Sequence, residues 1–82
     1  MNRRRLLEKA RNNPAGLRFS DLLLLVEAAG FTLRGSEGCH RLYTHPTVPE
    51  RLNLQRGRDG KAKGYQVRQF LTVLDRHGLT VE

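Results

Sequence analysis

The sequence predicts an α+β fold in which two helices cover one face of a three-stranded antiparallel sheet, in the order α-β-β-β-α. Apolar residues recur at helical spacing over 21–29 and again over 65–77. Between them lie short alternating segments separated by stretches that contain Gly and Pro. Such short connections favour antiparallel pairing, because a parallel neighbour needs a long crossover. With 82 residues the chain is expected to form a single domain over 1–82.

A short additional helix is expected in front of this core, over Arg3 to Arg11. Leu6, Leu7 and Ala10 are spaced to share one of its faces. Pro14 ends it, because proline disfavours helical conformation in the residue before it.

The first of the two covering helices is predicted to begin at Ser20. Serine is a good N-cap residue, and Asp21 places negative charge where the helix dipole favours it. Gly30 is expected to end this helix, since glycine adopts the left-handed conformation at low cost. Its core-facing residues are predicted to be Leu22, Leu23, Leu25 and Val26.

Three strands are predicted, over 31–34, 39–44 and 51–55, with turn-rich segments at 35–38 and 45–50 between them. Alternation along the second strand separates its side chains into two faces. Cys39, Arg41 and Tyr43 are predicted on one face, and His40, Leu42 and Thr44 on the other. We expect Cys39 to be a small core-facing residue and His40 to lie on the exposed face.

Residues 56–64 are predicted to form a flexible basic loop that leads into the last helix, from about Tyr65 to His77. Gly78 is its expected stop. Its apolar face is predicted to comprise Val67, Phe70, Leu71 and Leu74.

Composition favours a polyanionic partner. Lys and Arg total 15 against 8 Asp and Glu, and the net charge of +7 is spread along the chain. A folded basic face that meets nucleic acid, above all RNA, is the expected consequence. The longest apolar run, Leu22 to Val26, is too short to span a bilayer, so no membrane partner is expected. The single Cys fits a reducing cytoplasm, the expected location.

His40 is the candidate catalytic residue. An imidazole near neutral pKa can accept and return a proton, and beside an RNA 2′-hydroxyl it could help that oxygen attack the adjacent phosphate. A surface histidine without chemistry is the alternative. Cys39 should not pair with it, because neighbouring strand residues point to opposite faces. The histidines and Cys39 lack zinc-site spacing, so no metal or other cofactor is expected.

The candidate RNA-binding cations are centred on the basic loop. Its glycines allow close backbone approach to phosphate, and a helix N-terminus follows it. A solvated, hairpin-like loop is the alternative. We expect Lys61, Lys63 and Arg68 to hold phosphate, with Arg41 and Arg58 as weaker candidates. Few aromatics and no Trp favour contact by shape and phosphate over base stacking.

Several segments together resemble a known family. The run Gly38-Cys39-His40-Arg41-Leu42-Tyr43, followed by His45-Pro46, resembles the Gly-Ser-His segment of HicA-type toxins of bacterial toxin–antitoxin pairs. Residues 16–31 are similar to that family's first helix and turn. Residues 52–55 and 61–71 are similar to its third strand and second helix, so the resemblance runs over about residues 5–79.

The resemblance implies a fold similar to a double-stranded-RNA-binding domain and a metal-independent endoribonuclease that cleaves mRNA and inhibits translation. His40 matches the family's catalytic histidine. The implied partner is a HicB-type antitoxin, in a hetero-oligomer that covers the active face. Cys39 stands where the family usually has Ser, which reduces activity if that hydroxyl supports the histidine and is a mild change if it only fills space. A non-catalytic RNA-binding module of the same fold is the alternative function.

Overall fold

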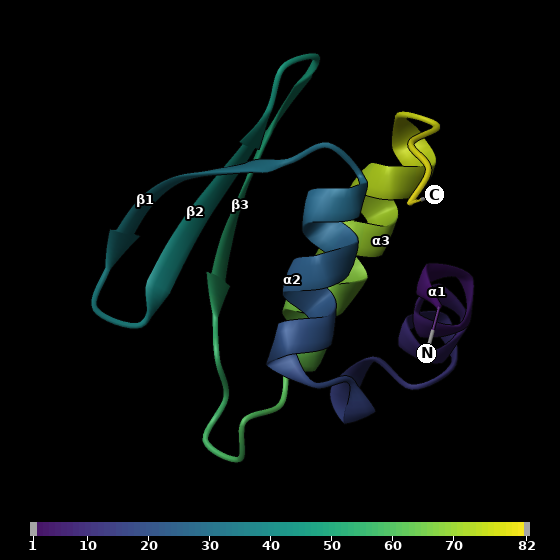
Figure 1. The fold of residues 1–82 in the computed structure, drawn as a ribbon, viewed down its shortest axis with the longest axis vertical. Coiled ribbons are helices and arrows are strands. Elements are labelled where there is room, and N and C mark those ends of the chain that lie inside the picture. The colour runs from purple at the N-terminus through teal and green to yellow at the C-terminus, as the bar shows by residue number, and fades with distance from the viewer. Residues whose placement is uncertain (1, 82) are drawn as a thin grey trace.

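The structure, a computed structural model, describes residues 2–81 and confirms the predicted α+β class and order of elements (Figure 1). The expected additional helix is present in front. The elements are α1 (Arg3–Asn12), the 3-10 turn η1 (Pro14–Gly16), α2 (Phe19–Ala28), β1 (Thr32–Glu37), β2 (His40–His45), β3 (Val48–Gln55) and α3 (Gly64–Arg76).

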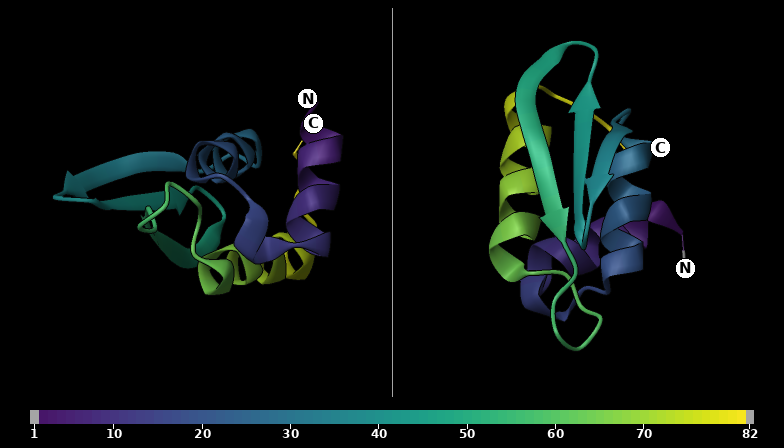
Figure 2. Two further views of the ribbon diagram at one scale, coloured as in Figure 1. Left: turned by 90° about the horizontal axis from the view of Figure 1, so that it is seen from below. Right: turned by 90° about the vertical axis from the view of Figure 1, so that its left-hand side faces the viewer.

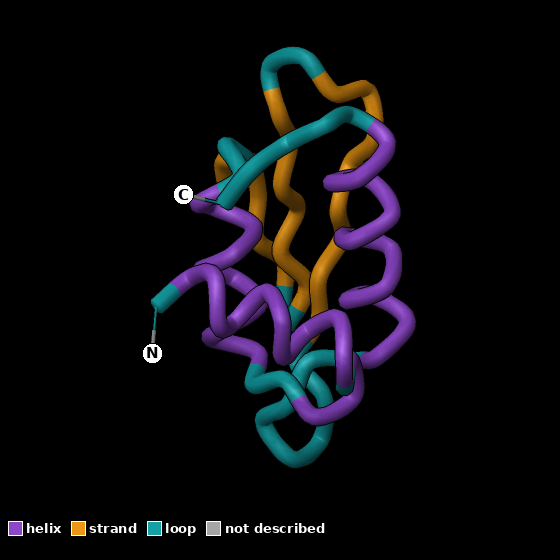
Figure 3. Tube along the Cα trace, turned by 90° about the vertical axis from the view of Figure 1, so that its right-hand side faces the viewer, coloured by secondary structure: helices purple, strands orange, loops and turns teal. Residues whose placement is uncertain are grey.

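The elements lie in layers. The three strands form one antiparallel sheet in the order β1-β2-β3. Helices α2 and α3 lie against one face of this sheet, and no other described element covers the opposite face (Figure 2). Helix α1 packs against α2, η1 and α3 on the side away from the sheet, as the view from that side shows (Figure 3). One sheet face is therefore open, as predicted.

The core fills the space between the sheet and the helices. Phe70 of α3 is fully buried. Its ring packs edge to face against that of Phe31, with 6.5 Å between the two ring centroids. The predicted apolar faces are confirmed, except that Leu7 and Leu23 are only partly buried at the edge of the core. The largest fully buried side chains are Tyr43, Phe70, Leu17, Leu22, Leu25, Leu52, Leu54, Leu74, Val26 and Val67.

Helix α2 begins earlier than predicted, and Ser20 is not its N-cap. The cap residue is Arg18, whose extended backbone precedes the first helical residue, Phe19. The backbone N–H of Phe19 donates to the carbonyl of Gly60 at 3.1 Å. This contact with a distant loop satisfies the first of the helix N–H groups that have no partner within the helix. Asp21 instead accepts a hydrogen bond from Nε of Arg18 at 3.1 Å.

The β1–β2 hairpin is longer than predicted. Residues 35–37, expected in a turn, belong to β1, and the turn is reduced to Gly38 and Cys39. A register shift between Leu33 and Gly35 lies within this pairing. Cys39 is therefore exposed in a turn, and the expectation that it faces the core is wrong. The far half of the hairpin extends past the helices, so its sequence needs no buried face.

Strand β3 also begins earlier than predicted, at Val48, because the break in the chain is reduced to a turn at Pro46 and Thr47. Both predicted glycine stops are confirmed. Gly30 follows α2 with φ +103° and Gly78 follows α3 with φ +62°, in the region that favours glycine. A Cβ on Gly30 would also lie 2.9 Å from Nε2 of His45. Across residues 2–81, no helix has the length and apolar character needed to cross a bilayer.

Candidate nucleic-acid interface

His40 is the first residue of β2, close to the tip of the β1–β2 hairpin. Its cross-strand partners are Glu37 of β1 and Gln55 of β3. Directly opposed residues share a face of the sheet, so these side chains project from the open face. His40 is exposed, as strand alternation predicted. Within the described chain its imidazole takes part in no hydrogen bond or ion pair, which leaves both ring nitrogens available to a ligand.

The other two histidines have structural partners instead. The Nδ1 atom of His45 accepts the backbone N–H of Thr47 at 3.1 Å. The Nε2 atom of His77 lies 2.8 Å from Oε1 of Glu50, and this contact lowers the pKa of the Glu50 carboxyl. Only His40 among the three histidines is thus free to meet a substrate. In the described range, no three His, Cys, Asp or Glu side chains gather in a group that could hold a metal ion.

A shallow hollow of about 350 Å³ borders His40 on the open face. Strand β1 contributes residues 35–37 to its wall, and Leu42 and Asn53 complete it beside His40. Gly35 lies opposite Leu42, and the absence of a side chain there leaves that part of the hollow open. The hollow therefore offers an imidazole, a carboxylate and an amide to one ligand.

Gln55 connects three separate segments beside His40. Its Oε1 accepts a hydrogen bond from Nζ of Lys63 at 2.9 Å, and its Nε2 donates to Sγ of Cys39 at 3.0 Å. Because Gln55 is also the cross-strand partner of His40, these bonds connect the Lys63 ammonium to the residue opposite His40. The sequence predicted His40 and Lys63 as site residues but gave no signal for Gln55, since strand register decides its place.

Gln66 fixes the end of β3 to the first turn of α3. It is 4% exposed, and its Oε1 accepts the backbone N–H of Gln55 at 3.0 Å. Its Nε2 donates to the carbonyl of Asn53 at 3.2 Å. Its side chain therefore continues the backbone pairing of β3 and sets where Gln55 and Lys63 meet. Sequence reasoning missed Gln66 because it lies within an otherwise apolar helix face.

The basic loop between β3 and α3, predicted to be flexible, is held in place by backbone hydrogen bonds. Gly57 N–H donates to the carbonyl of Lys61 at 2.8 Å. The N–H of Ala62 donates to the carbonyl of Leu17 at 2.8 Å, which joins the loop to the segment before α2. Gly60, with φ +81°, makes the tight turn possible. Backbone hydrogen bonds thus fix where the loop presents its cations.

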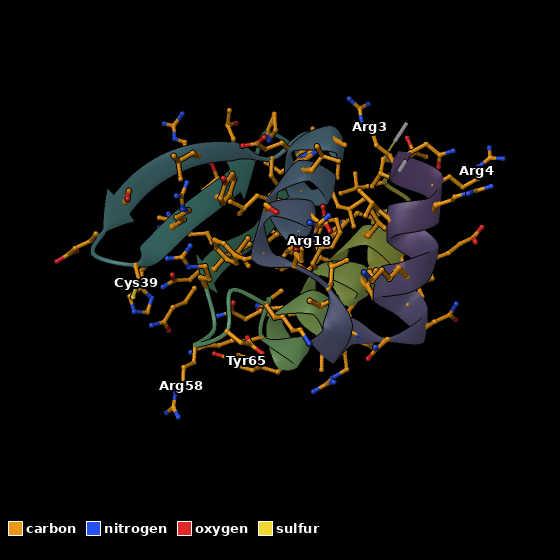
Figure 4. The ribbon with its side chains drawn as sticks, turned by 60° about the horizontal axis from the view of Figure 1, so that its bottom comes forward. Arg3, Arg4, Arg18, Cys39, Arg58 and Tyr65 are labelled. Atoms are coloured by element: carbon orange, nitrogen blue, oxygen red, sulfur yellow. The ribbon has the colours of Figure 1, made fainter. Side chains whose placement is uncertain are left out.

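Three further predicted cations, Arg58, Lys61 and Arg68, lie at different positions on the basic loop and on α3. Arg58 points away from the loop into solvent, below the hairpin tip that carries Cys39 (Figure 4). Lys61 is exposed on the same loop. Arg68 lies in the second turn of α3, and its Nη1 is 3.4 Å from where a Cβ on Gly64 would be. Lys63 is therefore the predicted cation that hydrogen bonds connect to the His40 region.

Arg41 lies on the opposite side of the hairpin from His40, as alternation predicted. It lines a second hollow together with Cys39 and Arg56. Arg41 also faces the Tyr43 hydroxyl, which donates to Oε2 of Glu27 at 3.3 Å. Burial and the Glu27 carboxylate raise the pKa of Tyr43, and Arg41 opposes that rise.

Comparisons with family models, with curated proteins and with solved structures found no match for this chain.

Proposed function

We propose that this chain is an mRNA-cleaving endoribonuclease, the HicA-type toxin of a toxin–antitoxin pair. The observation that carries the proposal is the combination at the hairpin tip. The His40 side chain is exposed and unengaged at the rim of a hollow, and its cross-strand partner Gln55 accepts a hydrogen bond from Lys63. The resemblance of residues 38–46 to the family's histidine segment, and a layout similar to that of a double-stranded-RNA-binding domain, support the same function.

The proposed reaction needs one proton acceptor and a cation. His40 removes the proton of an RNA 2′-hydroxyl, whose oxygen attacks the adjacent phosphorus as the bond to the 5′-oxygen breaks. The 5′-oxygen takes a proton from solvent water as it leaves, and protonated His40 returns its proton to the resulting hydroxide, so the products are a 2′,3′-cyclic phosphate and a 5′-hydroxyl. Lys63 stabilises the charge that builds on the phosphoryl oxygens. Lys61, Arg58 and Arg68 bind flanking phosphates, and the reaction as proposed needs no metal or other cofactor.

The proposed partner is a HicB-type antitoxin in the cytoplasm. The open sheet face, which carries His40, has no other element over it in the described chain. An antitoxin seated there would block the hollow and cover Leu42. The net charge of +7 favours an acidic partner surface. The proposal is a hetero-oligomer in which the toxin is inactive until its antitoxin is removed.

The test compares the wild type with His40→Ala and His40→Gln. Induced in a bacterium, the wild type should arrest growth and cut mRNA, and both variants should not. With purified protein and a defined transcript, loss of proton transfer should lower the cleavage rate by about 10²- to 10⁴-fold. Because His40 is exposed and unengaged, both variants should melt like the wild type. Products that carry a 5′-phosphate would contradict the 2′-hydroxyl mechanism.

A non-catalytic RNA-binding module is the second candidate function. The ordered basic loop favours it, because backbone hydrogen bonds already fix Arg58 and Lys61 before any ligand arrives. Under this reading the wild type binds the transcript and leaves it intact. His40→Ala would then weaken binding only slightly and would not change growth.

A further inference from the structure

A second hollow, of about 320 Å³, lies on the side of the β1–β2 hairpin opposite His40. Segments distant in sequence build it: the start of α2, the hairpin on both sides of its turn, and the residue that follows β3. Its lining residues are Phe19, Ser36, Gly38, Cys39, Arg41 and Arg56. No acidic side chain lines it.

Two guanidinium groups give this hollow its chemistry. Arg41 pairs across the sheet with Leu54, and Arg56 lies two residues beyond Leu54, so both arginines are on the same side of the sheet. Both are exposed. The planar fork of arginine matches phosphate oxygens in pairs, which a lysine ammonium does not. The hydroxyl of Ser36 and the thiol of Cys39 add weaker donors beside them.

The two hollows lie on opposite sides of the hairpin tip. Ser36 lines both of them, and the tip between them consists of Gly38 and Cys39. Gly38 has no side chain, and a Cβ there would meet nothing within 4 Å, so the tip is slender. A flexible single strand can bend around such a tip, whereas a duplex resists bending over so short a length.

We propose that the hollow of Arg41 and Arg56 binds a backbone phosphate of single-stranded RNA, while a neighbouring nucleotide of the same strand occupies the His40 hollow. The inference rests on the proposed function only in taking RNA as the ligand. It assigns Arg41 and Arg56 as a pair that binds phosphate. The RNA strand then bends around the hairpin tip. Contact through phosphate implies little dependence on base sequence.

The binding test uses His40→Ala protein, so that the RNA stays intact, and a short labelled single-stranded RNA. Arg41→Gln with Arg56→Gln is compared with Arg3→Gln with Arg5→Gln, which removes the same charge from α1 at the far end of the molecule from Cys39 (Figure 4). The first pair should weaken binding about tenfold more than the second. Losing one phosphate contact should reduce the slope of log affinity against log salt by roughly 0.7. Equal effects of the two pairs would overturn the proposal.

Cys39 provides a second measurement that needs no arginine variant. It is the only cysteine, it is exposed and it lines this hollow, so its alkylation rate reports occupancy. Bound RNA should slow alkylation of Cys39, and an unchanged rate with RNA bound would refute the inference. Binding here without cleavage by the wild type would refute only the nuclease. Cleavage that is indifferent to Arg41 and Arg56 would refute only this inference.

Discussion

Replacing Gln66 by Met tests whether one buried amide holds the candidate site to the fold. Methionine has similar length, is unbranched and is a good helix former, but it offers the backbone no comparable hydrogen bond. The substitution removes the bond from the Gln55 N–H at 3.0 Å and the bond to the Asn53 carbonyl at 3.2 Å. Gln69, exposed one turn later on α3, provides the matched control as Gln69→Met.

The expected loss follows from these two bonds. A typical net contribution is about 1 kcal/mol per bond, and an N–H left unpaired adds about 1 kcal/mol or more. Water reaches the partly buried Gln55 more easily than the core, so we expect a total of about 2–3 kcal/mol. In a domain of this size that corresponds to a fall in Tm of roughly 10–20 °C. Urea unfolding of both variants measures this loss of unfolding free energy. A loss below about 0.5 kcal/mol for Gln66→Met, with the native fold retained, would refute the reasoning.

The remaining predictions concern backbone, core and charge. Gly30→Ala should cost about 1–2 kcal/mol, because φ +103° disfavours a side chain, whereas Gly35→Ala should change urea stability by less than about 0.5 kcal/mol. Phe70→Ala should cost about 3–5 kcal/mol by the same measurement, since the ring is fully buried. A hydrogen bond from Arg11 lowers the pKa of Asp75 below 3.8. Asp75 therefore stabilises the fold above that pH and loses its contribution below it, so the urea midpoints of the wild type and Asp75→Asn should converge in acid.

Periodicity was sufficient to predict the helices, because burial of one face determines their sequence. Phe70 and Leu74 of α3 recur at helical spacing for this reason, and Gly78 marks the end. The hairpin gave no such signal. Its far half extends beyond the helices, so Ser36 and Glu37 remain exposed and resemble turn residues although they belong to β1. Alternation predicts strands only where one face is buried.

The same limit applies to the candidate site. The exposed position of His40 followed from alternation within one strand, which the sequence contains. The meeting of Gln55 with Lys63 did not, because it depends on the register between β2 and β3 and on how the basic loop folds back. Two tertiary hydrogen bonds determine that fold, and no local pattern encodes them: the N–H of Phe19 donates to the Gly60 carbonyl, and the N–H of Ala62 donates to the Leu17 carbonyl.

The place of Cys39 changes what its difference from serine means for the proposed toxin. It lies in a turn and is exposed, so it does not fill space in the core. Its sulfur accepts a hydrogen bond from Gln55 at 3.0 Å, and Gln55 in turn accepts one from Lys63. Sulfur is a weaker acceptor than a hydroxyl oxygen. The substitution therefore loosens the connection that positions the Lys63 ammonium while leaving His40 unaltered, so it bears on phosphate stabilisation and not on proton transfer.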